Sequence, residues 1–347
     1  MLIVLILAII ILLIGRIFSL DKRFIIGAHA VLFGVVILIN LILPTNNMLR
    51  QTVGGSVKNW IGLFVITLII FTYVVIVKKI KNSHINSQNQ HKNTKTFKPE
   101  ELNRYARHIV LREIGGVGQK KLKMARILVV GAGGLGSPVL QYLASCGVGT
   151  VGVIDNDLVD SSNLQRQVIH SDVNIGKPKV FSASEAMKAQ NPFVEVLPYN
   201  RLLNQEVAAD LFEDFDLILD GSDNAETRYL VNRTCVALKK PLISGAITQW
   251  EGQIAVFDSR KLGPCYQCIF PVAAAAGLAP SCSEAGVVGA LPGVIGSIMV
   301  VEAIKLITGA GESLNTRLLI YDALFAETRV IKIKRDPSCP VCSKKTG

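Results

Sequence analysis

The sequence has few charged and few aromatic residues. Asp, Glu, Lys and Arg make up 18% of its 347 residues, and Phe, Trp and Tyr only 6%. The net charge is nevertheless +11, from 37 basic and 26 acidic residues. A nucleic-acid-binding chain would gather these basic residues along an arm or interleave them with aromatics, and this sequence does neither. We therefore expect no nucleic-acid partner.

Charge is scarcest before residue 80, where three apolar runs occur. Met1–Ile14 is unbroken, Phe24–Leu43 is interrupted only by His29 and Asn40, and Trp60–Val77 is the third. A helix that spans a membrane needs about 20 apolar residues. A cleaved signal peptide would begin with positive residues and end in an A-x-A-like site, and neither is present. We expect residues 1–80 to form about three transmembrane helices.

Lys and Arg residues set the expected orientation of these helices. They are more frequent in segment 16–23 and directly after Val77 than in segment 44–58. The positive-inside rule then places the N-terminus outside and the remainder of the chain in the cytoplasm, with a multi-pass membrane anchor. Residues 81–98 are polar without an apolar period, which predicts a linker, and residues 99–347 form the remaining predicted domain.

After the linker the pattern becomes α/β. Arg126–Val130 predicts a buried strand, a glycine loop opens a helix, and Thr150–Ile154 predicts the next strand, which ends at Asp155. This order is the dinucleotide-type βαβ unit. Glycines let backbone N–H groups approach phosphate oxygens, and Asp155 would accept hydrogen bonds from ribose. The glycines are Gly131, Gly133, Gly134 and Gly136. The motif predicts a nucleotide-binding site but does not distinguish NAD from ATP as the ligand.

Polar residues after the later strands favour ATP. Asn163 and Arg166 occur in SSNLQRQ (161–167), and Lys179 ends the motif GKPK. Asp223 and Asn224 follow the predicted strand 216–219. Cations suit attack at an α-phosphate, where negative charge develops, and a carboxylate suits Mg²⁺. Taken singly, the cations could be surface charges, and Asp223 or Asn224 could cap a helix.

Four of the seven cysteines form two C-x-x-C pairs. Cys265 with Cys268 and Cys339 with Cys342 suit a structural tetrahedral zinc site that ties the tail to the core. A redox pair is the alternative interpretation. Cys282 stands apart, in a segment rich in small residues.

The apolar segment Gly293–Ile307 resembles a further membrane span by composition. However, it contains Glu302 and Lys305, and Pro292 precedes it. We expect a core helix of the domain 99–347 here.

From about Glu100 to Cys342 the chain resembles the MoeB/ThiF/HesA adenylyltransferases, relatives of the ubiquitin-activating enzymes, and is most similar to MoeB. The motifs that carry the resemblance are RYARHIVL, GAGGLGSP, DNDLVDSSNLQRQ, GKPK, DGSDNAETR, SGAITQWEGQI, PCYQC, SCSEAGV, GVIGSIMVVEAIK and CPVC.

The resemblance implies a Rossmann-like fold whose largely parallel sheet has an antiparallel extension. It also implies a homodimer that binds ATP, Mg²⁺ and zinc. Such enzymes transfer AMP to the C-terminal glycine carboxylate of a ubiquitin-like sulfur carrier protein that ends in Gly-Gly. Pyrophosphate is released, and the pathway is molybdopterin or thiamine biosynthesis. No sulfurtransferase domain follows Cys342, so we expect a separate sulfur donor protein.

The resemblance also implies roles for individual residues. Gly134 contacts phosphate, Asp155 holds the ribose, and Lys179 stabilises charge at the α-phosphate. Ser162, Asn163 and Arg166 line the triphosphate. Asp223 positions Mg²⁺ with Asn224 beside it. Arg107 matches an arginine that enters the neighbouring subunit's site, all four C-x-x-C cysteines hold zinc, and Cys282 matches a cysteine that some relatives link covalently to the carrier.

Other functions remain open at this point. The substrate could be another peptide or ubiquitin-like protein at the membrane. A NAD-dependent dehydrogenase rests on the glycine loop alone, and a non-catalytic nucleotide-binding module is the third alternative. Binding of ATP but not NAD would separate the first two classes.

Overall fold

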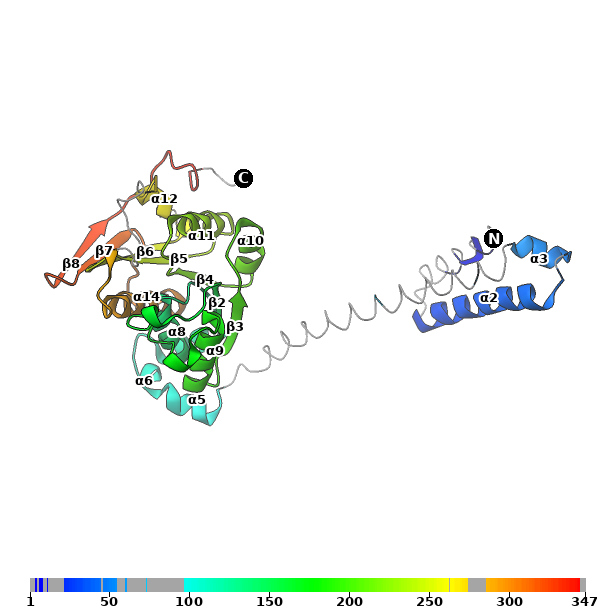
Figure 1. Cartoon of the computed structure of the whole chain (residues 1–347), viewed down its shortest axis with the longest axis horizontal. Helices are drawn as coiled ribbons and strands as arrows, with labels where there is room; N and C mark the ends of the chain where they lie inside the picture. Colours follow the sequence, from blue (N-terminus) through cyan, green and yellow to red (C-terminus); the bar gives the residue numbers. More distant parts are fainter. Residues whose placement is uncertain are drawn as a thin grey trace. The chain divides into compact units, whose positions relative to one another are not determined.

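The structure, a computed structural model, divides into two compact units, Met1–Thr94 and Lys95–Gly347 (Figure 1). It describes residues 22–54 except 45, residues 97–343 except 262 and 274–284, and residues 4, 6–8, 11, 60 and 73. Each unit is treated by itself below.

The first unit contains the helices α2 (Lys22–Ile42) and α3 (Met48–Val53). The side chain of Asn47 caps α3 by accepting a hydrogen bond from the Leu49 amide at 3.0 Å. On α2, the buried Asn40 donates from Nδ2 to the carbonyl of Val36 at 3.0 Å. The amide nitrogen of Asn40 is thus satisfied within its own helix, whereas its buried Oδ1 has no hydrogen-bond partner among the described residues.

The three predicted transmembrane helices are not confirmed. Among the described residues, one helix is long and apolar enough to cross a membrane, and that is α14 (Leu291–Thr308) in the second unit, where half of the helix is buried in the protein. The apolar part of α2, Gly27–Ile42, is shorter. The predicted spans Met1–Ile14 and Trp60–Val77 lie mostly outside the described residues.

The second unit is built on one sheet with the strand order β3-β2-β1-β4-β5-β6-β7-β8. The first five strands in this order are parallel, and β6, β7 and β8 continue the sheet in antiparallel fashion. The predicted fold class, with its antiparallel extension, is therefore confirmed. The strands are β1 (Arg126–Val130), β2 (Thr150–Asp155), β3 (Glu195–Asn200), β4 (Leu217–Asp220), β5 (Leu242–Ile247), β6 (Glu251–Phe257), β7 (Arg317–Asp322) and β8 (Glu327–Lys332).

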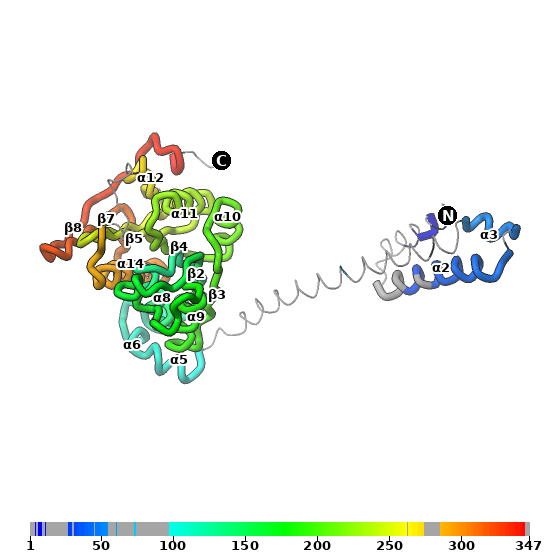
Figure 2. Tube along the Cα trace, viewed as in Figure 1, coloured from blue at the N-terminus to red at the C-terminus, as the bar shows by residue number. Residues whose placement is uncertain are grey.

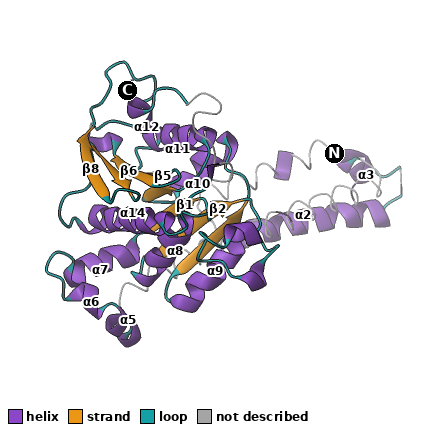
Figure 3. Cartoon of the chain, turned by 60° about the vertical axis from the view of Figure 1, so that its left-hand side comes forward, coloured by secondary structure: helices purple, strands orange, loops and turns teal. Residues whose placement is uncertain are grey.

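Helices cover both faces of the parallel part (Figure 3). Because side chains alternate along a strand, Ile127 and Val129 of β1 enter one core, while Leu128 and Val130 enter the other. Residues of α8 (Gly136–Ser145), α9 (Lys179–Gln190) and α14 complete the first core. Residues of α10 (Gln205–Glu213) and α11 (Ala225–Ala237) complete the second.

The other helices that the structure describes in the second unit are short. They are α5 (Pro99–Arg104), α6 (Ala106–Ile109), α7 (Gly115–Met124) and α12 (Tyr266–Ile269), with 3-10 turns η1 (Ser161–Asn163), η2 (Asp172–Asn174) and η3 (Ser259–Lys261). The chain trace shows α12 close to the C-terminal segment, which arrives from the end of β8 (Figure 2). The tail is thereby brought back to the body of the unit.

The expected core helix at 293–307 is confirmed as α14. Ile295, Met299 and Ala303 are fully buried in the first core. The buried Glu302 pairs with Lys305 and accepts a hydrogen bond at 2.7 Å from the Leu314 amide. Its carboxylate therefore has the partners that a buried charge requires.

Candidate functional site

A cleft of about 530 Å³ lies at the carboxyl edge of the parallel strands. Ligands of open α/β sheets bind at this edge. The structure brings eight of the predicted site residues into the wall of this cleft: Gly131, Gly133, Gly134, Asp155, Arg166, Lys179, Asp223 and Asn224. A larger hollow, of about 690 Å³, is lined by the ends of α14, β7 and β8 and contains none of them.

The glycine loop between β1 and α8 is packed against its own backbone. Gly131 has a φ of +94°, a conformation that L side chains rarely adopt. A Cβ atom on Gly136 would lie 2.0 Å from the Gly131 carbonyl oxygen. Gly136 is buried at the start of α8 and does not line the cleft, so its role is the close approach of helix and loop.

Asp155 ends β2 and holds the glycine loop in place. Its Oδ2 accepts a hydrogen bond from the Ala132 amide at 2.7 Å, and its Oδ1 accepts one from the Asp157 amide at 2.8 Å. A carboxylate oxygen can accept more than one hydrogen bond. Asp155 can therefore support the loop and still accept a bond from a ligand hydroxyl in the cleft.

Arg166 reaches the cleft from the turn after η1. Its Nη2 donates to Oδ1 of Asn163 at 2.6 Å, and its Nη1 donates to the Ser162 carbonyl at 3.2 Å. Ser162 and Asn163 do not line the cleft themselves. In this structure they orient the arginine. The exposed Asp160 caps η1, and hydrogen bonds from Ser162 lower the pKa of that carboxyl.

Lys179 is the first residue of α9, and its side chain is only 5% exposed. Its Nζ lies 2.8 Å from Oδ2 of Asp157, whose own side chain is 60% exposed. A buried ammonium thus faces the cleft, and among the described residues it pairs with the solvated carboxylate of Asp157. Such a cation is disposed to bind an anion, because burial has removed most of its water.

Asp223 and Asn224 occupy the loop between β4 and α11. Asn224 caps α11 by accepting a hydrogen bond from the Thr227 amide at 2.9 Å, so the cap interpretation holds for this residue. Asp223 is exposed and lies in the cleft wall. A carboxylate in this position could supply one oxygen ligand to Mg²⁺, with phosphate oxygens and water as the others.

A buried network that the sequence did not reveal fixes this loop. Asp220 accepts hydrogen bonds at Oδ1 from the amide and hydroxyl of Ser222. Arg228 donates from Nη1 to the Gly245 carbonyl at 2.9 Å and from Nη2 to the Ser222 carbonyl, and its Nη1 lies 4.0 Å from Asp220 Oδ2. In the sequence, the role of Arg228 is indicated only by its position, one helical turn after the Asn224 cap.

His170 is a second residue whose role could not be predicted from the sequence. It is buried, its Nε2 lies 2.9 Å from the Ala132 carbonyl, and its Nδ1 lies 2.9 Å from the hydroxyl of Ser182. A carbonyl only accepts, so Nε2 carries the proton and Nδ1 accepts from the hydroxyl. Burial lowers the pKa of His170. The neutral ring joins the glycine loop to α9, and a lone histidine in the sequence gave no sign of it.

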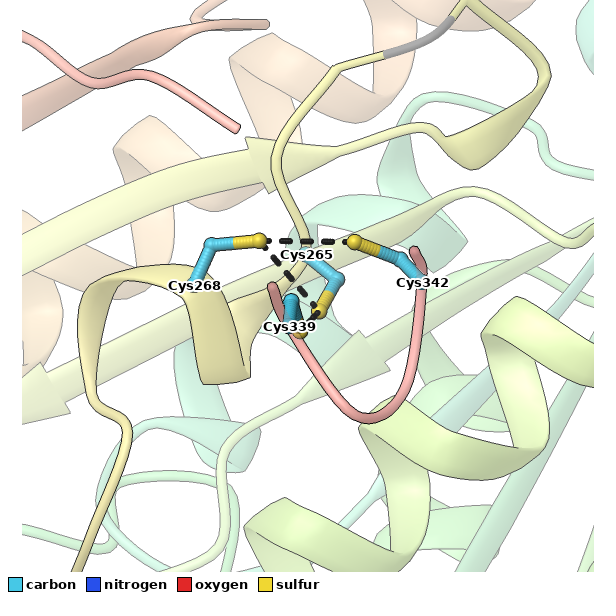
Figure 4. A group of neighbouring side chains, drawn as sticks. All are labelled: Cys265, Cys268, Cys339 and Cys342. Atoms are coloured by element: carbon cyan, nitrogen blue, oxygen red, sulfur yellow. Dashed lines mark hydrogen bonds between the residues drawn. The ribbon is translucent and has the colours of Figure 1, made fainter. Parts of the chain in front are cut away.

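The four cysteines of the C-x-x-C pairs meet in one cluster (Figure 4). Their sulfur atoms all lie within 4.8 Å of one another, and Cys265 Sγ is 3.9 Å from Cys268 Sγ and 3.6 Å from Cys339 Sγ. Zn–S bonds of about 2.3 Å in a tetrahedron place sulfur atoms about 3.8 Å apart. The donor set therefore fits zinc, and the spacing is too long for disulfides.

The pKa values of these thiols are shifted in different directions. Burial raises the pKa of Cys265 strongly and raises the pKa of Cys268 to about 11. For Cys339, burial acts to raise the pKa, but hydrogen bonds from the backbone N–H groups of Cys342 and Val341 and from the thiols of Cys265 and Cys268 together outweigh burial, and the pKa is lowered. A metal must displace protons from the first two thiols, since thiolates are the ligands.

One predicted residue lies away from the cleft, and another is not among the described residues. Arg107 is exposed on α6 and does not line the cleft of its own chain. Cys282 falls in segment 274–284, outside the described residues. Of the other cysteines, Cys235 is buried and Cys146 is half-buried at the end of α8.

Comparison with known proteins decides the family. Residues 105–341 match the ThiF family. The chain belongs to the ThiF family. Over 247 residues it is 50% identical to the sulfur carrier protein adenylyltransferase of Thermus thermophilus, covering 70% of this chain and 91% of that protein.

Other relatives differ in length or identity. The probable adenylyltransferase/sulfurtransferase MoeZ of Mycobacterium tuberculosis is 50% identical over 244 residues, which cover 70% of this ThiF-family chain but only 62% of MoeZ. Among solved structures, MccB of E. coli is similar with a TM-score of 0.62 at 22% identity, covering 73% of this chain and 77% of that chain. This last likeness shows the fold alone.

Proposed function

We propose that this ThiF-family chain uses ATP to adenylate the C-terminal glycine carboxylate of a ubiquitin-like sulfur carrier protein. The observation that carries the proposal is the buried Lys179, which faces the carboxyl-edge cleft together with Arg166. The 50% identity to a sulfur carrier protein adenylyltransferase supports the choice of substrate. Hydride transfer develops no charge at a phosphate, so it does not require two cations at this position.

The chemistry requires alignment and charge neutralisation rather than an enzymic nucleophile. A carboxylate oxygen of the carrier attacks the α-phosphorus of ATP. The bond to the bridging oxygen breaks, and pyrophosphate leaves with that electron pair. Lys179 and Arg166 stabilise the charge that develops on the α-phosphate and the leaving group. The amides of the glycine loop and the carboxylate of Asp155 hold the phosphates and the ribose.

Three further roles belong to the same proposal. Asp223 would ligate Mg²⁺, which neutralises phosphate charge when bound. Arg107 would complete the site of a second subunit in a homodimer, in agreement with its exposure on α6. The four cysteines would hold structural zinc. A carrier for molybdopterin or thiamine synthesis, a separate sulfur donor protein and a covalent role for Cys282 remain predictions.

The test is ATP–pyrophosphate exchange with purified full-length chain and candidate carriers that end in Gly-Gly. We expect exchange with one carrier, none with the same carrier lacking its last glycine, and none in Asp223→Ala. Glu226→Ala is the matched control, since Glu226 is an exposed carboxylate in the first turn of α11 that does not line the cleft. Binding of NAD rather than ATP, or exchange that ignores the carrier terminus, would contradict the proposal.

We also propose that the first unit anchors the chain to a membrane, with the N-terminus outside and the second unit in the cytoplasm. The support is a set of large apolar side chains on α2 that are 51–69% exposed: Val31, Val35, Leu38, Leu41 and Ile42. Exposed apolar area of this extent favours a lipid or helix partner.

Expression of the full chain and of residues 95–347 tests the anchor. After alkaline carbonate extraction we expect the full chain in the membrane pellet and the shorter chain in the supernatant. Recovery of the full chain in the supernatant would refute the anchor.

A further inference from the structure

Asn232 is a fully buried amide on α11, only 1% exposed, and both ends of its side chain are used. Its Oδ1 accepts a hydrogen bond from the Tyr266 amide at 2.9 Å. Its Nδ2 donates to the sulfur of Cys265 at 3.6 Å. Burying an amide is costly unless its groups are paired, and here the partners are the cysteine cluster and the residue next to it.

Asn232 stands in a row of residues that runs the length of α11. Positions four apart lie on one face of a helix, and Asn224, Arg228, Asn232 and Val236 have this spacing. Asn224 and Arg228 line the cleft, whereas Val236 packs against the cysteine cluster. One helix face therefore connects the Asp223 loop to the four thiols, and Asn232 is its contact with Cys265.

Tyr266 occupies the space between the cluster and the cleft. It lies between two of the cysteines in the sequence, lines the cleft, and packs edge-on against Tyr229 at a centroid distance of 5.5 Å. Its ring also contacts Phe270 at 4.8 Å, and Phe270 lines the same cleft. The backbone that presents a thiol to the cluster thus also carries an aromatic wall of the cleft.

We propose that Asn232 is a positioning residue of the cysteine centre, which orients Cys265 for the metal and fixes α12 as a wall of the cleft. The inference rests on the proposed zinc site. An N–H donor to a ligating sulfur spreads its negative charge and holds its orientation. Loss of such an outer partner typically weakens metal affinity by about 10–100-fold. The nucleotide end of the cleft, more than a helical turn away along α11, keeps its own contacts.

The test measures metal rather than catalysis. Full-length chain and its variants are loaded with zinc, and zinc affinity is measured by competition with a chromophoric chelator. Co²⁺ is then substituted to follow the thiolate-to-metal absorption band. Asn232→Ala removes both hydrogen bonds, whereas Asn232→Asp keeps an acceptor for the Tyr266 amide but places an anion beside Cys265. Thr234→Ala is the control, since its hydroxyl donates to the Leu230 carbonyl of the same helix, away from the four thiols.

We expect zinc affinity to fall about 10–100-fold in both Asn232 variants, with a changed Co²⁺ band. The control should match the wild type, and ATP affinity should stay within about twofold in all variants. Thermal unfolding in excess zinc shows whether each variant is folded. If Asn232→Ala does not fold, Asn232→Asp still provides the test, because it keeps the acceptor for the Tyr266 amide.

Wild-type zinc affinity retained in folded Asn232→Asp would overturn the inference while leaving the zinc site standing. Absence of zinc from the wild-type chain would overturn both, and carrier-dependent exchange would report on the proposed function separately.

Discussion

Replacement of Lys179 by alanine should lower the rate of catalysis strongly and the stability of the fold only slightly. The ammonium is buried, yet its partner Asp157 is 60% exposed and stays hydrated when left alone. An ion pair with one solvated partner contributes about 0–1 kcal/mol to folding. The space vacated by the lysine opens into the cleft, where water can fill it.

The expected catalytic loss is larger. Removing one fixed electrostatic donor from a site of developing charge typically costs about 10²–10³ in rate, or about 2.7–4 kcal/mol. We expect Lys179→Ala to lower carrier-dependent ATP–pyrophosphate exchange by that factor, while the thermal midpoint changes by a few degrees at most. Initial exchange rates at saturating carrier, with calorimetry on the same samples, measure both.

Lys177→Ala is the matched control, two residues away. Lys177 pairs with Glu185, the two side chains are 33% and 61% exposed, and Lys177 does not line the cleft. We expect wild-type exchange from it. A folded Lys179→Ala enzyme that retains more than about a tenth of the wild-type rate would refute the electrostatic role, because the typical loss is at least tenfold greater.

Two other predictions concern the glycine loop. Gly136→Ala places a Cβ 2.0 Å from the Gly131 carbonyl oxygen, so the loop must move. We expect loss of ATP binding, measured by calorimetry, and a loss of about 1–3 kcal/mol in the free energy of unfolding. Wild-type ATP affinity in this variant would contradict the packing. Because burial lowers the pKa of His170 below its unfolded value, the neutral ring stabilises the fold above about pH 6.5, and this contribution is lost as the pH falls toward the folded pKa. Urea unfolding between pH 7.5 and 5.5 should therefore show a smaller pH dependence in His170→Asn than in the wild type, and equal slopes would contradict it.

The parallel half of the fold could be predicted because its signals are local. After Arg126 the run to Val130 is apolar, a glycine loop follows it, and β1 has the predicted bounds in the structure. Strand 216–219 was off by one residue, since Asp216 precedes β4 and instead accepts a hydrogen bond from the Arg126 amide. That pairing joins residues 90 apart and has no local signature.

The site was predictable to the extent that it depends on strand ends. Carboxyl ends of parallel strands meet at one edge, so Asp155 and Asp223 were expected to lie together, and both line the cleft. Arg228, His170 and Asn232 were not found, because each acts through a buried contact with a distant backbone or thiol. Polar residues inside helical patterns look like ordinary surface positions until their burial is known.

Strand β5 brings apolar side chains into the wall of the cleft. It is parallel to β4 and antiparallel to β6, so the edge where β4 ends is also the edge where β6 begins. Lys179 and Asp223 reach the cleft from loops that follow parallel strands, whereas Ile247 ends β5, and Tyr266 and Phe270 follow β6 in the chain.

A triphosphate needs the cations and the amides of the glycine loop. The carbon chain of a peptide would exchange water for aromatic and aliphatic surface, which Ile247, Tyr266 and Phe270 offer in the same cleft. We therefore expect the carrier tail to enter over β5 and β6 and to meet the α-phosphate where these residues adjoin the cations.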